Sequence, residues 1–91
     1  MDLTFNKDGG SFVAECVTTA DFNLHIEGVL LGDYKIYQKT AGNDYALVRG
    51  LADRPNYEKV SDFDFSGVVY PKYIKIVSEV EPTLAIVTFA Q

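Results

Sequence analysis

The sequence predicts an all-β protein, a small antiparallel β-sandwich or jelly roll of about eight short strands. Apolar and polar residues alternate with a period of two along most of the chain, which is typical of half-buried strands. The chain has six Tyr and six Phe, and aromatic residues favour strands over helices. Turn residues recur roughly every 8 to 12 residues, and no segment has a sustained helical period. At 91 residues we expect one domain, spanning residues 1–91.

The first third of the chain contains three of these strands. Residues 3–6 read as a short strand that a turn at residues 7–10 closes. Residues 11–18 are partly apolar on both faces, which is typical of a central strand. Residues 19–27 have the clearest alternation of the chain. Three apolar side chains of this strand face the predicted core: Phe22, Leu24 and Ile26.

The middle of the chain predicts a hairpin between two irregular segments. Residues 28–33 are a connection bracketed by glycines. Residues 34–40 and 45–51 are strands joined by the turn Ala-Gly-Asn-Asp at residues 41–44, where Gly and Asn tolerate a positive φ. Residues 52–59 contain a proline that breaks strand pairing, so we expect a loop there.

The last third predicts three further strands. Residues 60–67 alternate, with two phenylalanines on one face and two aspartates on the other. Residues 73–80 and 83–90 are rich in β-branched residues, and we expect them to form the last strand pair, joined by Glu81 and Pro82.

Charge and cysteine usage exclude several classes of protein. The net charge is −5 and Arg49 and Arg54 are the two arginines, so the basic patch that nucleic-acid binding requires is missing. Cys16 is the single cysteine, which excludes an internal disulfide and a thiolate zinc site and indicates a reducing cytoplasm. The first ten residues do not form a signal peptide, and the apolar runs are too short to span a membrane. We therefore expect neither nucleic-acid nor membrane binding.

A row of polar residues includes the one histidine of the chain. Asp21, Asn23, His25 and Glu27 alternate with the core residues of the strand at 19–27. Residues two apart on a strand lie about 6.6 to 6.8 Å apart, so His25 and Glu27 could hold one cation together. Zinc and iron sites use three or four ligands, however, and there is no second histidine. A solvated strand face is the favoured interpretation.

Other catalytic and metal-binding patterns are no stronger. Asp62 and Asp64 are spaced like paired carboxylates, so a calcium site shared with Asp21 stays open beside the favoured interpretation of a solvated face. Cys16 lies in an apolar strand, where a thiol is usually inert, and nothing in the sequence supports its pairing with His25. We expect no enzymatic activity and no cofactor.

The last strands carry more apolar residues than a small sandwich can bury. Such a fold covers one face of each sheet, so the surplus indicates either a crowded core or a face covered by another subunit. The residues that we expect at such an interface are Tyr73, Val77, Ala85, Val87 and Phe89. The predicted partner is a protein, either a second copy of the chain or a larger protein assembly.

The tyrosines support an alternative function. Exposed tyrosines can bind sugars or proteins, although tyrosines at the margin of a small core are also common. In a carbohydrate- or small-ligand-binding module the residues that we expect to contact the ligand are Tyr37, Arg54 and Tyr57.

Two segments resemble a known group of proteins. Residues 12–27, FVAECVTTADFNLHIE, and residues 69–90, VYPKYIKIVSEVEPTLAIVTFA, are similar to small β-rich virion proteins of tailed phages and prophages of gut Bacteroidales. The resemblance implies an accessory structural role of the head-decoration or head-fibre type, with self-association, in a virion assembled in the bacterial cytoplasm. It implies no catalytic residues.

Overall fold

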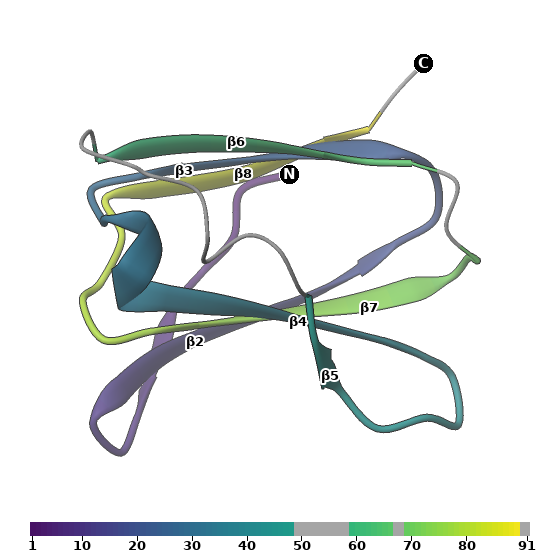
Figure 1. Ribbon diagram of the computed structural model, residues 1–91, viewed down its shortest axis with the longest axis horizontal. Coiled ribbons are helices and arrows are strands. Elements are labelled where there is room, and N and C mark those ends of the chain that lie inside the picture. Colours follow the sequence, from purple (N-terminus) through teal and green to yellow (C-terminus); the bar gives the residue numbers. More distant parts are fainter. Residues whose placement is uncertain (49–58, 67–68, 90–91) are drawn as a thin grey trace.

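The protein folds as two antiparallel sheets laid face to face, as the computed structural model shows for residues 1–48, 59–66 and 69–89 (Figure 1). This arrangement confirms the predicted small β-sandwich. The strands of this part of the chain are β1 (Asn6–Asp8), β2 (Ser11–Thr18), β3 (Phe22–Glu27), β4 (Tyr34–Thr40), β5 (Ala46–Leu47), β6 (Val60–Phe65), β7 (Lys72–Ser78) and β8 (Leu84–Phe89), with a 3-10 turn, η1 (Leu31–Asp33), before β4.

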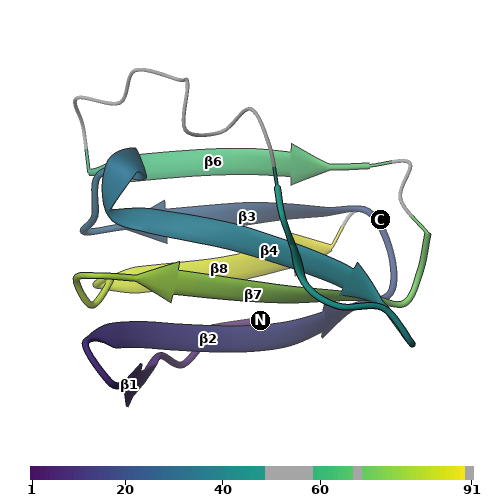
Figure 2. The same ribbon diagram turned by 60° about the horizontal axis from the view of Figure 1, so that its bottom comes forward.

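The two sheets differ in size. The larger sheet has five strands in the order β1-β2-β7-β4-β5, and the smaller has three in the order β6-β3-β8. Figure 2 shows β3 and β6 running side by side, as do β4 and β7. β3 is therefore the central strand of the smaller sheet, and β7 is the central strand of the larger one.

The inward faces of both sheets form one apolar core. Phe22, Leu24 and Ile26 of β3 are buried, as predicted, and they belong to the same cluster as Ile74 and Ile76 of β7. Burying a side chain of this kind stabilises the fold by about 1.5 to 3 kcal/mol. The remaining buried members of the cluster are Val29, Tyr34, Ile36, Phe63, Ala85 and Val87.

The start of the chain connects the two sheets. The Leu3 amide donates to the Ala85 carbonyl (2.8 Å), and the Val87 amide donates to the Met1 carbonyl (2.8 Å). The chain then crosses to the larger sheet, where residues 6–8 form β1 and pair with β2. The predictions of a strand at residues 3–6 and a turn at 7–10 were therefore wrong in their bounds, because the turn needs only the two glycines at 9 and 10.

The end of the chain also differs from the prediction. The expected pairing of residues 73–80 with 83–90 was wrong, because β7 lies in the larger sheet and β8 in the smaller, where it pairs with β3. The expected hairpin is confirmed as the pair of β4 with the shorter β5. The predicted loop at 52–59 lies almost wholly outside the described residues. Within the described part of the chain, no helix is long and apolar enough to cross a membrane.

Candidate functional site

The outer face of the smaller sheet carries the polar row that the sequence predicted. Because Phe22, Leu24 and Ile26 point into the core, Asn23, His25 and Glu27 point outward from β3. The antiparallel register places His25 opposite Asp62 of β6 and Asn23 opposite Asp64. The outer face of β6-β3-β8 with these five residues is called the acidic face below.

Hydrogen bonds tie the acidic face together across the strands. Asn23 Nδ2 donates to Asp64 Oδ1 at 3.0 Å. His25 Nδ1 lies 2.8 Å from Asp62 Oδ1, and His25 Nε2 lies 2.6 Å from Glu27 Oε2. The hydrogen bonds with Glu27 and then Asp62 raise the pKa of His25 above its ordinary value of 6.5. Both ring nitrogens donate when the imidazole is protonated, so this geometry favours the charged form.

The carboxylates of this face do not converge on a cation. Glu27 and Asp62 contact opposite nitrogens of the His25 ring, so they lie on different sides of it. Asp21, the third predicted calcium ligand, instead accepts a hydrogen bond from the Tyr70 hydroxyl at 2.7 Å. In the described ranges no three His, Cys, Asp or Glu side chains are grouped so that they could hold a metal ion.

The outer face of the larger sheet carries a cluster of aromatic and cationic side chains. The sequence has the pattern Tyr-x-Lys four times, and two of these patterns lie on strands, Tyr37 and Lys39 on β4 and Tyr73 and Lys75 on β7. The two strands pair antiparallel, so Tyr37 lies opposite Lys75 and Lys39 lies opposite Tyr73. Tyr45, just before β5, completes the cluster. These five residues are called the Tyr–Lys face below.

Each lysine of the Tyr–Lys face lies between two rings. Lys39 Nζ is 4.8 Å from the centre of the Tyr45 ring and 5.5 Å from that of Tyr73. Lys75 Nζ is 4.6 Å from the Tyr45 ring and 5.4 Å from the Tyr37 ring. A cation–π contact at an exposed site is worth about 0.5 to 1 kcal/mol. Tyr45 therefore links the two halves of the cluster.

Valines flank the Tyr–Lys face on the β2 side. Val13 pairs with Val77 in the strand register, and Val17 pairs with Tyr73. Val17 is 46% exposed, which is high for a valine in a strand with a neighbour. Glu15 lies opposite Lys75, and its charge adds to the effect of burial in raising the pKa of Tyr45. The face thus combines exposed apolar surface with fixed charges.

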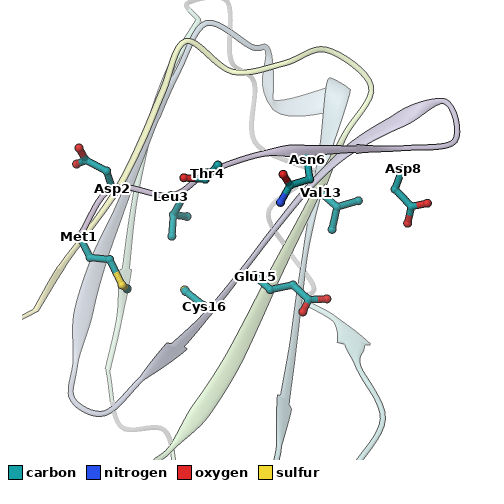
Figure 3. Close-up of a pocket in the computed structure, with 9 residues that line it drawn as sticks. All are labelled: Met1, Asp2, Leu3, Thr4, Asn6, Asp8, Val13, Glu15 and Cys16. Atoms are coloured by element: carbon teal, nitrogen blue, oxygen red, sulfur yellow. The ribbon is translucent and has the colours of Figure 1, made fainter.

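A cleft of about 530 Å³ lies between the start of the chain and β2 (Figure 3). Leu3 points from the first segment toward Cys16 on β2, and both side chains pack against the core. Burial raises the pKa of the Cys16 thiol above its ordinary value of 9.0, so little thiolate forms at neutral pH. The other lining residues are Met1, Asp2, Thr4, Asn6, Asp8, Val13 and Glu15.

The structure separates the one thiol from the one imidazole of the chain. Cys16 packs against the core from the larger sheet, whereas His25 points outward from the smaller sheet, between two carboxylates. These two residues therefore do not form a nucleophile–base pair.

The predicted interface residues fall into two groups. Tyr73 and Val77 lie on the outer face of β7, as expected. Ala85 and Val87 do not: they are 4% and 0% exposed and lie in the core, so their assignment to an outer face was wrong. Phe89 is partly buried and packs against the same core. In the pairing of β8 with β3, Val87 lies opposite Leu24 and Ala85 opposite Ile26. Ala85, Val87 and Phe89 therefore share the side of β8 that faces the core.

The residues of the ligand-binding alternative are partly described. Tyr37 lies on the Tyr–Lys face, whereas Arg54 and Tyr57 lie outside the described residues. Sequence reasoning missed Lys39, Lys75 and Tyr45 as parts of one cluster. The repeated Tyr-x-Lys spacing was the available signal, but it becomes informative once β4 and β7 are known to be neighbours.

Comparison with known protein families, with characterised proteins and with solved structures finds no match to this chain.

Proposed function

We propose that this protein is a non-enzymatic structural protein that self-associates or docks on a larger protein assembly through its Tyr–Lys face. The observation that carries this proposal is the cluster of three tyrosines and two lysines beside the exposed Val17. Tyrosine is enriched at protein interfaces, because its large ring packs well and its hydroxyl can still form a hydrogen bond.

The cluster is also suited to binding because the cation–π contacts restrict its lysine side chains before a partner arrives. The lysine side chains are held over the rings, so less side-chain freedom is lost when a partner covers them. A free lysine loses about 1.5 to 2 kcal/mol of rotamer entropy when it is fixed. The resemblance to small virion proteins supplies the proposed setting, an accessory component of a phage or prophage virion that is assembled in the bacterial cytoplasm.

A carbohydrate- or small-ligand-binding module is the second candidate. Tyr37, Tyr45 and Tyr73 form a group of aromatic rings of the kind on which sugars stack. The ammonium groups of Lys39 and Lys75 lie over these same rings, however, and a sugar would have to displace them. This competition makes a protein partner the better match.

The test is the mass of the tag-free protein in solution, measured by light scattering over a concentration series. We expect species larger than a monomer, and we expect Tyr45→Ser to weaken their association by about tenfold or more, because truncating a central interface residue often costs over 1 kcal/mol. Unchanged association of Tyr45→Ser would contradict the proposed face. A strictly monomeric protein that binds a glycan in a screen would favour the second candidate.

A matched pair of valines supplies the control. Val17 borders the Tyr–Lys face and is 46% exposed, whereas Val80 lies in the turn between β7 and β8 and is 50% exposed. Val17→Asn should weaken association, and Val80→Asn should leave it unchanged. Equal effects of the two substitutions would indicate a general loss of exposed apolar surface and would count against the Tyr–Lys face.

A further inference from the structure

Strand β2 has a neighbour on both sides at its start but not along its second half. β7 pairs with it over residues 12–18, whereas β1 pairs with Ser11–Val13. Before β1 the chain lies away from β2 and follows the smaller sheet, where the Leu3 amide donates to the Ala85 carbonyl at 2.8 Å. Within the described part of the chain, residues 14–18 of β2 therefore have no strand beside them on the side opposite β7.

The turn between β1 and β2 shows which backbone groups point to this open edge. The turn consists of the two glycines at 9 and 10, so Asp8 and Ser11, which flank it, form a hydrogen-bonded pair. In a strand, the N–H and C=O groups of every second residue point to the same side. Glu15 and Val17 therefore direct theirs away from β7, in the spacing that an added strand would bond to.

A cleft runs along the open edge. Figure 3 shows the first segment of the chain and β2 diverging from their hairpin, with Leu3 directed toward Cys16 across the space between them. This space is the cleft of about 530 Å³. Glu15 and Val17 lie beside Cys16 with their side chains on the outer face, and Val17 is 46% exposed. An extended chain laid along β2 would place one side chain toward Leu3 and Cys16, and the side chains on either side of it next to Glu15 and Val17.

The charges along the cleft favour a basic occupant. Of the residues that line it, none is a lysine, arginine or histidine. The Met1 amino group is occupied, because it donates to the Val87 carbonyl at 2.8 Å. Lys75 lies opposite Glu15 on β7, but its ammonium lies over two rings of the Tyr–Lys face, at 5.4 and 4.6 Å, on the β4 side. The carboxylates that line the cleft are those of Asp2, Asp8 and Glu15.

We propose that β2 accepts an extended segment of a partner protein as an added antiparallel strand along residues 15–18. The segment has an apolar side chain opposite Val17, a small one opposite Cys16 and a basic one opposite Glu15. Main-chain hydrogen bonds supply the affinity in this mode of recognition, and alternate side chains supply the specificity. The antiparallel direction continues that of β1 and is slightly more stable than the parallel one. This site goes beyond the proposed function, because it uses the backbone of β2 and not the rings of the Tyr–Lys face.

A synthetic peptide tests the proposal directly. The probe is acetyl-Ser-Thr-Val-Ala-Arg-Ser-amide, whose Val, Ala and Arg would lie opposite Val17, Cys16 and Glu15 of an antiparallel pair. It is titrated into isotopically labelled protein while the backbone amide resonances are recorded. We expect saturable shifts of the Glu15 and Val17 amides, and slower hydrogen exchange at both, because the added strand would bond to these groups.

Two methylated peptides supply a matched control that leaves the protein unchanged. N-methylation of the peptide Val and Arg removes the two donors that would face β2, so it should abolish binding. N-methylation of the peptide Ala removes a donor that points away from β2, so this peptide should bind like the parent. Equal effects of the two modifications would show that side chains alone hold the peptide, and strand addition would be wrong.

A charge exchange tests the position of the basic residue. Replacing the peptide Arg by Glu should weaken binding to the wild type by about tenfold or more, because like charges would then meet. The protein variant Glu15→Lys should bind this glutamate peptide better than the parent peptide. Recovery of binding requires the variant to be folded, so a loss of stability cannot imitate it. The same order of the two peptides on both proteins would contradict the proposed register.

The remaining outcomes separate this site from the Tyr–Lys face. Tyr45→Ser should bind the peptide like the wild type, and loss of binding in this variant would place the peptide on the Tyr–Lys face and overturn strand addition. Absence of saturable shifts at Glu15 and Val17 with millimolar peptide also overturns it, while leaving association through the Tyr–Lys face as proposed. If these two amides become protected as the protein concentration rises without peptide, the occupant is a second copy and the proposed partner is wrong.

Discussion

Among the glycines of the described residues, Gly28 is the position where one added methyl group should most disturb the sandwich. It follows directly after β3 and has a φ of +94°, a conformation that side chains rarely adopt. A Cβ there would lie 2.6 Å from Thr83 Oγ1, 2.7 Å from the Thr83 backbone nitrogen and 2.9 Å from Thr83 Cγ2. The Thr83 nitrogen cannot move freely, because it donates to the Glu27 carbonyl at 2.9 Å.

Gly42 separates the cost of the backbone conformation from the cost of the clash. Its φ is +85°, close to that of Gly28, but a Cβ there would have no neighbour within 4 Å. We expect Gly42→Ala to destabilise the fold by about 1 to 2 kcal/mol through its left-handed backbone. Gly28→Ala should cost about 1 to 3 kcal/mol more, because it adds overpacking against Thr83. The entropy that alanine removes from the unfolded chain is the same in both variants and cancels.

Urea denaturation measures this difference. With a slope of about 1 kcal/mol per molar urea for a small domain, the midpoint of Gly28→Ala should lie about 1 to 3 M below that of Gly42→Ala. Equal midpoints for the two variants would refute the reasoning, because they would mean that the contact with Thr83 costs nothing. Thr83→Ala in the Gly28→Ala background should recover part of the loss, since it removes the side-chain contacts but leaves the backbone nitrogen in place.

Four further predictions test the core, the histidine, the thiol and the aspartates. Ile76→Ala should lower the free energy of unfolding by about 2 to 5 kcal/mol and Ile76→Val by about 0.5 to 1.5, because this side chain is 0% exposed; similar urea midpoints would contradict its burial. The pKa of His25 is raised on folding, so its stabilisation is present below pH 6.5 and is lost as the pH rises through the folded pKa. The melting temperature of the wild type, relative to that of His25→Gln, should therefore fall between pH 5.5 and 7.5. If the melting temperatures of the two proteins change with pH in parallel, the contacts of His25 with Glu27 and Asp62 do not stabilise the fold. Iodoacetamide should modify Cys16 several-fold more slowly in the native protein than in urea, since burial raises the thiol pKa; equal rates would show that the thiol is accessible. The hydrogen bonds of Asp62 and Asp64 predict a melting temperature that neither EDTA nor added calcium changes, and a calcium-dependent rise would restore the calcium site.

The smaller sheet shows how far alternation alone can predict a strand. In β3, one set of alternate residues is apolar and the other is polar, so the buried face follows from the sequence. In β8 both sets are largely apolar, since Leu84 and Ile86 alternate with Ala85 and Val87. A register shift of one residue would exchange the inner and outer faces of β8, and the residue types of β8 do not decide which set faces inward. The pairing of β8 with β3 decides which set faces inward, and this pairing joins distant parts of the chain.

The order of the strands in each sheet could not be predicted from the sequence either, because it also depends on contacts between distant parts of the chain. A period of two shows that a segment is a strand, but it does not identify the neighbour of that strand. β7 and β8 are consecutive and both rich in β-branched residues, yet the turn between them crosses from one sheet to the other. The Tyr–Lys face depends directly on this outcome, because the rings and ammonium groups meet only when β7 lies beside β4.

The first residues of the chain cover the β8 edge of the smaller sheet. An unpaired edge strand is a template on which another chain can add. At β8 this template is already used, because the Leu3 amide donates to the Ala85 carbonyl and the Val87 amide donates to the Met1 carbonyl. In the larger sheet, β1 pairs with the start of β2 and is itself an edge strand. The chain thus caps the β8 edge with its own first residues, so another chain cannot add to this edge without displacing them. Docking through the Tyr–Lys face, as proposed, leaves these contacts intact.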